Sequence, residues 1–255
     1  MFKLSIVFYS LLTIYPIIIA QTEYAFIGPS SNKKLILGEE NSRPIASITK
    51  LFTSYYILKS GYNLKQNIII VENAKFTKLN PKAPLLQKGE KINLESAIEI
   101  LLITSSNLVA RSIAISLEGS ENKFVNKMNA YFNSFPMNHT HFADTHGLSV
   151  NSKSSIKDII SLLYLYKKEN FLMNIIRKNK SEIITQSKIL YKIETTLEKN
   201  EFKEFKLFGK TGSTLAAGRC FAGFVEKNNE LSLLVILNSE NIYIDIEKII
   251  SEKIN

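Results

Sequence analysis

The sequence predicts an α/β protein of the α+β type, with one antiparallel sheet flanked by helices and a helical lobe inserted between its strands. Strand-like segments occur near both ends of the chain, and segments with helical spacing fill the middle. Among the 255 residues, 45% are hydrophobic, which is enough for a sizeable core. No internal repeat or linker rich in Pro, Gly or Ser divides the chain, so a single folded domain is expected.

The first twenty residues have the pattern of a secretory signal peptide. Lys3 is followed by an uncharged apolar stretch, residues 4–19, and Ala20 supplies a small residue before the expected cleavage point. About sixteen apolar residues interrupted by Pro16 are short for a bilayer span. We therefore expect export, removal of residues 1–20, and no stable membrane anchor afterwards. Retention of this segment as an anchor is the alternative.

The mature chain, residues 21–255, begins with a predicted hairpin. Residues 23–27 and 34–37 have strand-like composition, and a Gly-Pro-Ser-Ser-Asn turn separates them. Three further strands are expected in the last third, at residues 205–208, 219–225 and 231–237. Strands from both ends of the chain would then pair in one sheet.

The middle of the chain has the apolar spacing of helices. The first predicted helix covers residues 47–60, and Gly61 ends it. Four more are expected, at residues 94–104, 108–117, 124–132 and 156–166. Residues 73–91 and 178–204 show no clear period and are expected to be irregular borders of a cleft.

A last amphipathic helix is expected near the C-terminus, and no additional domain is expected after it. Its apolar face consists of four isoleucines, Ile242, Ile246, Ile249 and Ile250. Attachment to a membrane surface is one interpretation, but the acidic residues among them favour packing against the core.

Charge and metal-ligand patterns exclude several classes of function. The net charge is +9, yet only four of the 32 basic residues are arginines and the lysines form no dense block, so no nucleic-acid partner is expected. Cys220 is the single cysteine and is expected to be a small buried residue. His139, His141 and His146 lack the spacing of a zinc site. Neither a metal nor a cofactor is predicted.

Ser47 and Lys50 are the first candidate catalytic pair. They lie three residues apart at the start of the first predicted helix, so their side chains share one face. A serine hydroxyl becomes nucleophilic when a base takes its proton, and a partly desolvated neutral lysine is such a base. The pattern alone is common, and Ser47 as a helix cap with Lys50 in solvent is the alternative.

A second candidate motif, Ser-Ser-Asn at residues 105–107, lies at the break between two predicted helices. In a cleft, Ser105 could relay a proton and Asn107 could hold a substrate carbonyl. Capping of the helix by small polar residues explains the same pattern.

A third candidate motif, Lys210-Thr211-Gly212, lies at the end of a predicted strand. Lys210 and Thr211 could meet a substrate carboxylate there, and Gly212 would let the substrate backbone approach closely. An ordinary strand end is the alternative. The order S-x-x-K, S-x-N and K-T-G is the set found in penicillin-binding proteins and class A β-lactamases.

With two further segments, residues 142–148 (FADTHGL) and 209–220 (GKTGSTLAAGRC), these motifs resemble the D-alanyl-D-alanine carboxypeptidase family. Its members are low-molecular-mass penicillin-binding proteins, serine-type D-Ala-D-Ala peptidases of bacteria. The resemblance extends over roughly residues 22–238. It implies a β-lactamase/transpeptidase-like fold and a place in the periplasm or cell envelope.

The resemblance also implies the roles of individual residues. Ser47 would be the acylated nucleophile, Lys50 its base, and Ser105 a proton relay between Lys50 and Lys210. The substrate-binding residues would be Asn107, Lys210, Thr211, Gly212 and Ser213. The backbone N–H groups of Ser47 and Ser213 would form the oxyanion hole.

The implied function is hydrolysis of peptidoglycan stem peptides after D-alanine, with β-lactams as covalent inhibitors. The chain ends about forty residues after the third motif, which favours the D,D-endopeptidase branch, whose members cut peptide crosslinks, as the alternative. In place of the usual Asn-Pro before His-Gly-Leu stand Asp144 and Thr145, so that loop is expected to differ.

Two other classes fit the sequence less well. A β-lactamase needs a carboxylate that activates water, and Glu118 follows the second motif too closely for this role. An inactive peptidoglycan-binding protein would not need an intact serine and two lysines. The roles of His146 and Arg219 stay open.

Overall fold

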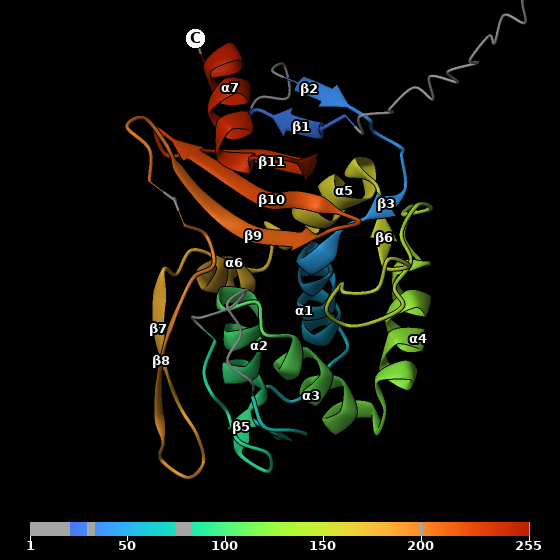
Figure 1. The fold of residues 1–255 in the computed structure, drawn as a ribbon, viewed down its shortest axis with the longest axis vertical. Helices are drawn as coiled ribbons and strands as arrows, with labels where there is room; N and C mark the ends of the chain where they lie inside the picture. Colours follow the sequence, from blue (N-terminus) through green and yellow to red (C-terminus); the bar gives the residue numbers. More distant parts are fainter. Residues whose placement is uncertain (1–20, 30–33, 75–82, 199–200, 255) are drawn as a thin grey trace, which may run out of the picture.

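The computed structural model describes residues 21–29, 34–74, 83–198 and 201–254 (Figure 1). The predicted signal peptide, residues 1–20, lies outside the described residues. In the described part of the chain, no helix has the length and apolar character required to cross a membrane.

A five-stranded antiparallel sheet joins the two ends of the chain, as predicted. Its order is β2-β1-β11-β10-β9, so the N-terminal hairpin pairs with the C-terminal strands through β1 and β11. The strands are β1 (Glu23–Ile27), β2 (Lys34–Leu37), β9 (Lys206–Thr214), β10 (Gly218–Lys227) and β11 (Glu230–Ser239). Strand β9 lies at one edge and faces the inserted helical lobe (Figure 1).

The predicted helices are all present, with small shifts at their ends. Helix α1 follows a short 3₁₀ turn, η1. The bounds are η1 (Ala46–Ile48), α1 (Thr49–Lys59), α2 (Leu94–Ile103), α3 (Asn107–Glu118), α4 (Glu121–Phe132), α5 (Ile156–Tyr166), α6 (Asn170–Ile176) and α7 (Ile242–Ile254).

Three small two-stranded sheets and helix α6 were not predicted. The small sheets pair β3 (Arg43–Pro44) with β6 (Lys153–Ser154), β4 (Asn67–Ile69) with β5 (Lys91–Asn93), and β7 (Lys180–Ile184) with β8 (Leu190–Glu194). Strands of two or three residues are too short to show a period. The β7–β8 hairpin buries only one side chain in each strand, Ile183 and Ile193, so its alternation is weak. The expectation that residues 178–204 are irregular was therefore wrong.

Both faces of the large sheet are covered. Alternate residues of β11 point to opposite sides: Val235 belongs to the core shared with the helical lobe, and Leu234 to the core shared with α7. The four isoleucines of α7 are at most 5% exposed, which confirms the core-packing interpretation of this helix. Cys220 is fully buried, as expected.

Helix α1 runs through the centre of the helical lobe. All its residues from Thr49 to Ile57 are buried, although several are polar. Thr53 donates a hydrogen bond to the Thr145 carbonyl, and the Ser54 hydroxyl lies 3.0 Å from that of Tyr166. Thr53 and Ser54 are thus paired inside the lobe, whereas the buried Thr49 hydroxyl has no hydrogen-bond partner among the described residues.

Candidate active site

Ser47 lies on a strained turn at the start of α1. The preceding residue, Ala46, has φ +47°, in the left-handed region that non-glycine residues rarely adopt and that costs roughly 1–3 kcal/mol. The Ser47 hydroxyl makes no capping hydrogen bond and instead lies 2.8 Å from Lys50 Nζ. The alternative of Ser47 as a helix cap and Lys50 in solvent is therefore wrong.

Lys50 is fully buried, and its amine has three partners. Lys50 Nζ lies 2.8 Å from Ser47 Oγ, 2.7 Å from Asn107 Oδ1 and 2.8 Å from the His146 carbonyl oxygen. A neutral amine has two N–H donors and one lone pair. The two carbonyl oxygens can take the two donors, and the lone pair is left to accept a proton from the serine. The same three partners also satisfy the charged ammonium.

The electrostatics of the cluster favour the neutral form of Lys50. Burial is the largest cause that lowers the Lys50 pKa well below its ordinary value of 10.5, and the positive charge of Lys210 lowers it further. The Asp144 carboxylate acts in the opposite direction. The lowered pKa makes the neutral amine, the form that can act as a base, available at lower pH than in an exposed lysine.

The loop at residues 144–149 presents the His146 carbonyl to Lys50. The Asp144 carboxylate accepts hydrogen bonds from the N–H groups of Gly147 (2.6 Å) and Ser149 (2.7 Å) and from Ser152 Oγ (2.9 Å). Gly147 has φ +84°, and a Cβ there would lie 1.8 Å from the Ala46 carbonyl oxygen. Only glycine lets this loop pack against the turn that carries Ser47.

The His146 side chain lies in a carboxylate environment. Its Nδ1 is 3.3 Å from Asp144 Oδ2, and its Nε2 is 3.7 Å from Glu121 Oε1. Burial is the main cause that lowers the His146 pKa, while both carboxylates raise it. The contact of His146 with the catalytic pair is made by its backbone carbonyl.

Strand β9 forms the other wall of the site. The Lys210-Thr211-Gly212 motif lies within this strand, which continues to Thr214, so the expected strand end was misplaced. A Cβ at Gly212 would lie 2.8 Å from the Ser47 backbone nitrogen. The missing side chain thus lets the strand itself approach the nucleophile.

Lys210 is the second buried lysine of the site. It is 1% exposed, and its Nζ donates a hydrogen bond to the Thr211 carbonyl at 2.8 Å. Burial lowers the pKa of Lys210 from 10.5 to about 7. The ammonium form of Lys210 is therefore destabilised by burial, and a bound anion would stabilise it.

Ser105 is placed less directly at the site than expected. Ser105 has φ +61° between α2 and α3, and within the described residues no hydrogen bond links it to Lys50 or Lys210. Lys50 reaches Asn107, the first residue of α3, because the chain turns sharply at Ser105. The relay role of Ser105 stays a prediction.

Thr211 and Ser213 complete the predicted substrate-binding set. The Thr211 hydroxyl lies 2.9 Å from that of Thr196, in the segment after β8. Ser213 is exposed and lies opposite Arg219 in the β9–β10 register. Both side chains are thus on the edge strand but outside the hydrogen-bond cluster of Lys50.

The described residues contain no cluster of three or more His, Cys, Asp or Glu side chains suited to a metal ion. Glu118 accepts a hydrogen bond from Tyr62 and lies 2.6 Å from Lys127, so its carboxylate is engaged away from Lys50. The site therefore consists of one serine, two buried lysines and their neutral hydrogen-bond partners.

Solved structures with this arrangement of sheet and lobe define a class, the DD-transpeptidases and penicillin-binding proteins. A mutant of the Streptomyces K15 DD-transpeptidase aligns with a TM-score of 0.77 at 19% identity and covers 90% of this chain and 95% of that chain. Penicillin-binding protein D2 from Listeria monocytogenes, in the ampicillin-bound form, aligns with a TM-score of 0.72 at 20% identity, over 91% of this chain and 97% of that chain. At this level of identity the likeness shows the fold.

Within that class, the chain belongs to the D-alanyl-D-alanine carboxypeptidase family, whose sequence model matches residues 17–241. A D-alanyl-D-alanine endopeptidase from Escherichia coli K12 is 28% identical over 201 residues, which are 77% of this chain and 64% of that protein. D-alanyl-D-alanine carboxypeptidase DacA from the same organism is 28% identical over 178 residues, 61% of this chain and 44% of that protein. The chain thus matches less than two thirds of the length of these relatives.

Proposed function

We propose that this protein is a serine-type D-Ala-D-Ala carboxypeptidase that acts on peptidoglycan stem peptides through an acyl-serine intermediate. One observation carries the proposal: the Ser47 hydroxyl lies 2.8 Å from the buried amine of Lys50, whose other partners among the described residues are two carbonyl oxygens. This arrangement is suited to a neutral amine that takes the serine proton.

In the acylation step, Ser47 Oγ attacks the carbonyl carbon of the penultimate D-alanine. Its proton passes to Lys50 Nζ, while Asn107 and the His146 carbonyl hold that amine in place. The bond to the terminal D-alanine breaks, and the leaving amine takes up a proton from the cluster. The backbone N–H groups of Ser47 and Ser213 would stabilise the oxyanion, by roughly 3–4 kcal/mol for each donor.

In the second step, water attacks the acyl-serine ester and its proton returns through the same cluster. Lys210 would attract the terminal carboxylate of the substrate, because an anion offsets the burial of its charge. A β-lactam would acylate Ser47 in the same way and leave slowly.

Cleavage of peptide crosslinks is the second candidate function. The endopeptidase relative aligns with a larger share of this chain than DacA does, 77% against 61%. The reacting atoms are the same, because both reactions break the bond after a D-alanine. The two reactions differ in the leaving group, which is a single D-alanine in one case and a second stem peptide in the other.

We further propose that the protein acts in the periplasm or at the cell envelope after export by residues 1–20. The charge and apolar pattern of that segment supports export. Mass spectrometry of protein recovered from the cell envelope would test it: a chain that starts at Gln21 is expected, and an intact Met1 would contradict cleavage.

The enzymatic proposal is tested by incubation of residues 21–255 with a fluorescent penicillin, followed by intact mass. A stoichiometric adduct is expected on the wild type and none on Ser47→Ala. Digestion of purified muropeptides then separates the two activities, since a carboxypeptidase releases D-alanine and an endopeptidase converts dimers to monomers. A folded wild type that forms no adduct would rule out the acyl-serine mechanism.

A further inference from the structure

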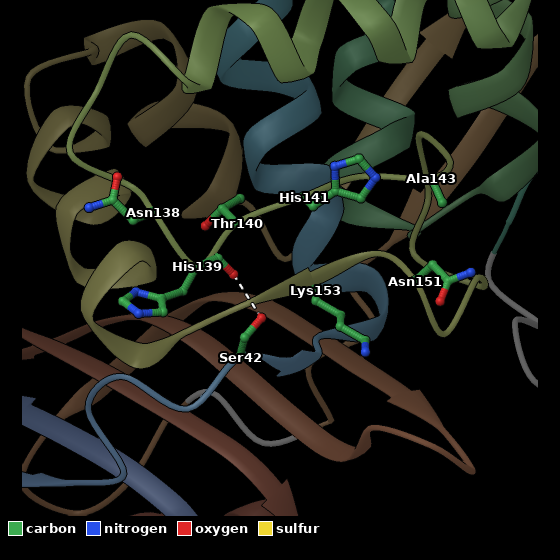
Figure 2. A pocket seen from close by; sticks show the side chains of 8 residues that line it. All are labelled: Ser42, Asn138, His139, Thr140, His141, Ala143, Asn151 and Lys153. Carbon is green, nitrogen blue, oxygen red and sulfur yellow. Dashed lines mark hydrogen bonds between the residues drawn. The ribbon is translucent and has the colours of Figure 1, made fainter.

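A hollow of about 510 Å³ has polar side chains at most of its lining positions (Figure 2). It is bordered by the segment at residues 138–143, by Asn151 and Lys153, and by Ser42. The Ser42 hydroxyl donates a hydrogen bond to the His139 carbonyl at 2.9 Å and so links the two sides of the hollow (Figure 2). The roles assigned to the catalytic residues do not involve this surface.

The backbone places two nitrogen-bearing side chains on one side of the hollow. His141 and Lys153 exchange both backbone hydrogen bonds, at 2.9 and 2.8 Å. Residues opposite each other in such an antiparallel pair direct their side chains to the same face, with Cα atoms about 5.5 Å apart. Both side chains line the hollow, and they extend in different directions from the paired backbone (Figure 2).

The hollow carries positive charge and no negative charge of its own. None of its lining side chains is acidic. In the parts of the chain that the structure describes, no carboxylate lies within 4.0 Å of Lys153 Nζ. The Asp158 carboxylate nearby is 1% exposed and accepts hydrogen bonds from the His139 N–H (2.8 Å) and the Thr140 hydroxyl (2.7 Å). Asp158 Oδ1 also lies 3.9 Å from His139 Nδ1, so the carboxylate acts at the His139 side of the hollow, and Lys153 is the charge that an entering anion would meet unpaired.

The hollow lies within reach of a peptide bound at Ser47. Lys153 pairs with Pro44 in the β3–β6 sheet, and Pro44 precedes Ser47 by three residues. Three residues span at most about 11 Å and adjacent strands are about 5 Å apart, so the Cα atoms of Lys153 and Ser47 are separated by at most about 16 Å. That distance corresponds to about four or five extended residues.

We propose that this hollow is a subsite for a free carboxylate of the substrate peptide, several residues away from the bond that Ser47 attacks. The proposal rests on the proposed peptidase function and makes the preferred substrate an acidic peptide of several residues. Lys153 would form the ion pair, and the Asn151 carboxamide on the same side of the hollow would supply a further hydrogen-bond donor (Figure 2). A substrate as small as a β-lactam would not extend into the hollow.

The test compares two synthetic peptides that end in D-Ala-D-Ala and differ only in whether their side carboxylates are free or amidated. For the wild type we expect the free acid to be the better substrate. In Lys153→Gln we expect kcat/KM for the free acid to fall roughly three- to tenfold, through KM, as is usual for an open, water-accessible charge pair. The amidated peptide should be hydrolysed at the same rate by both proteins, and Lys153→Glu should favour it.

Lys248→Gln is the matched control, because it removes the same charge from the exposed side of α7. It should leave both peptides unaffected. The penicillin acylation rate of Lys153→Gln should equal that of the wild type, which separates this proposal from the peptidase proposal. If acylation is normal but Lys153→Gln treats both peptides as the wild type does, the subsite is wrong. An equal loss for both peptides would point to a neutral ligand and would also overturn it.

Discussion

The lysines of the active site and those of the β7–β8 hairpin differ in burial, in ion pairing and in the direction of their pKa shifts. Lys50 and Lys210 are almost completely buried, contact no carboxylate among the described residues, and have lowered pKa values. Lys180 on the hairpin is exposed, lies 2.8 Å from Glu194, and has a raised pKa. In a chain with many lysines, the sequence position of a lysine therefore says little about its chemistry, and burial without a counter-ion decides it.

The difference has a simple physical origin. Desolvation disfavours the ammonium form, whereas a nearby carboxylate favours it. Around Lys50 the fold supplies carbonyl oxygens and a hydroxyl, which stabilise an amine in either state. Asp144 is the carboxylate that influences this cluster, and it acts from within its own loop.

The largest effect is expected from Lys50→Arg. A guanidinium keeps the charge and the donors but is never deprotonated in proteins, so it cannot act as a base. We expect the rate of acylation by a fluorescent penicillin to fall roughly 10²–10⁴-fold. Lys50→Met, which is neutral and smaller, should show a similar loss with a folded circular dichroism spectrum. Acylation within threefold of wild type in either variant would show that Lys50 is not the base.

Asp144→Asn should produce the next largest effect. The substitution keeps the shape but removes charge-assisted hydrogen bonds to the Gly147 and Ser149 N–H groups, each worth roughly 1.5–3 kcal/mol. Because the Asp144 charge raises the Lys50 pKa, its removal should lower that pKa further. The amine is then neutral at lower pH. The fall in acylation rate on the acid side of the pH profile, the acid limb, should therefore shift to lower pH.

Asp158→Asn is the control for this prediction. Asp158 is also a buried carboxylate that accepts from a backbone N–H and a hydroxyl, and it is not among the groups that shift the Lys50 pKa. Asp158→Asn should lower the stability of the protein and leave the acid limb of the acylation pH profile unchanged. If Asp144→Asn lost activity without a shift of the limb, the role of Asp144 would be limited to holding the loop.

The active site shows which features the sequence could predict and which it could not. Ser47 and Lys50 were found because their spacing fixes one helical face, and the sheet was found because alternation is visible at both ends of the chain. The third partner of Lys50, the His146 carbonyl, carries no signal, since every residue has a backbone carbonyl. The left-handed turn at Ala46 is also invisible, because alanine does not favour it.

The sequence indicated the role of Asp144 only indirectly. In the sequence, Asp144 and Thr145 stand out as a departure from the usual Asn-Pro. In the structure, Thr145 binds Glu121 through its N–H and hydroxyl, and Asp144 organises the loop at residues 144–149. Such contacts join segments far apart in the chain, which local patterns do not reveal.

The pH dependence of stability gives a smaller effect with a definite sign. The Lys210 pKa is about 7 in the folded protein and about 10.4 in the unfolded chain. Between these values the unfolded chain binds more protons, so stability rises with pH, by up to roughly 1.4 kcal/mol per pH unit for each such lysine. Below pH 7 both states are protonated and the folded state retains the full penalty of the buried charge.

Urea unfolding at pH 7 and pH 9 measures this effect. The wild type should be more stable at pH 9, and Lys210→Met should gain less. The raised pKa of Tyr55, about 12, lowers stability only above pH 10, outside this window. Equal stability of the wild type at the two pH values would show that the buried lysines are not desolvated as their burial implies.

The smallest effect is expected from Lys180→Gln, and its smallness is informative. The Lys180–Glu194 pair is exposed to water, where the attraction between charges is screened and the ordering of two long side chains opposes it. The variant should keep the melting temperature, the acylation rate and the pH dependence of stability seen in the wild type. Lys180→Gln and Lys210→Met each remove one ammonium group, so any difference between them measures what burial adds. A clear loss of stability in Lys180→Gln would mean that pairing, rather than burial, distinguishes the two sets of lysines.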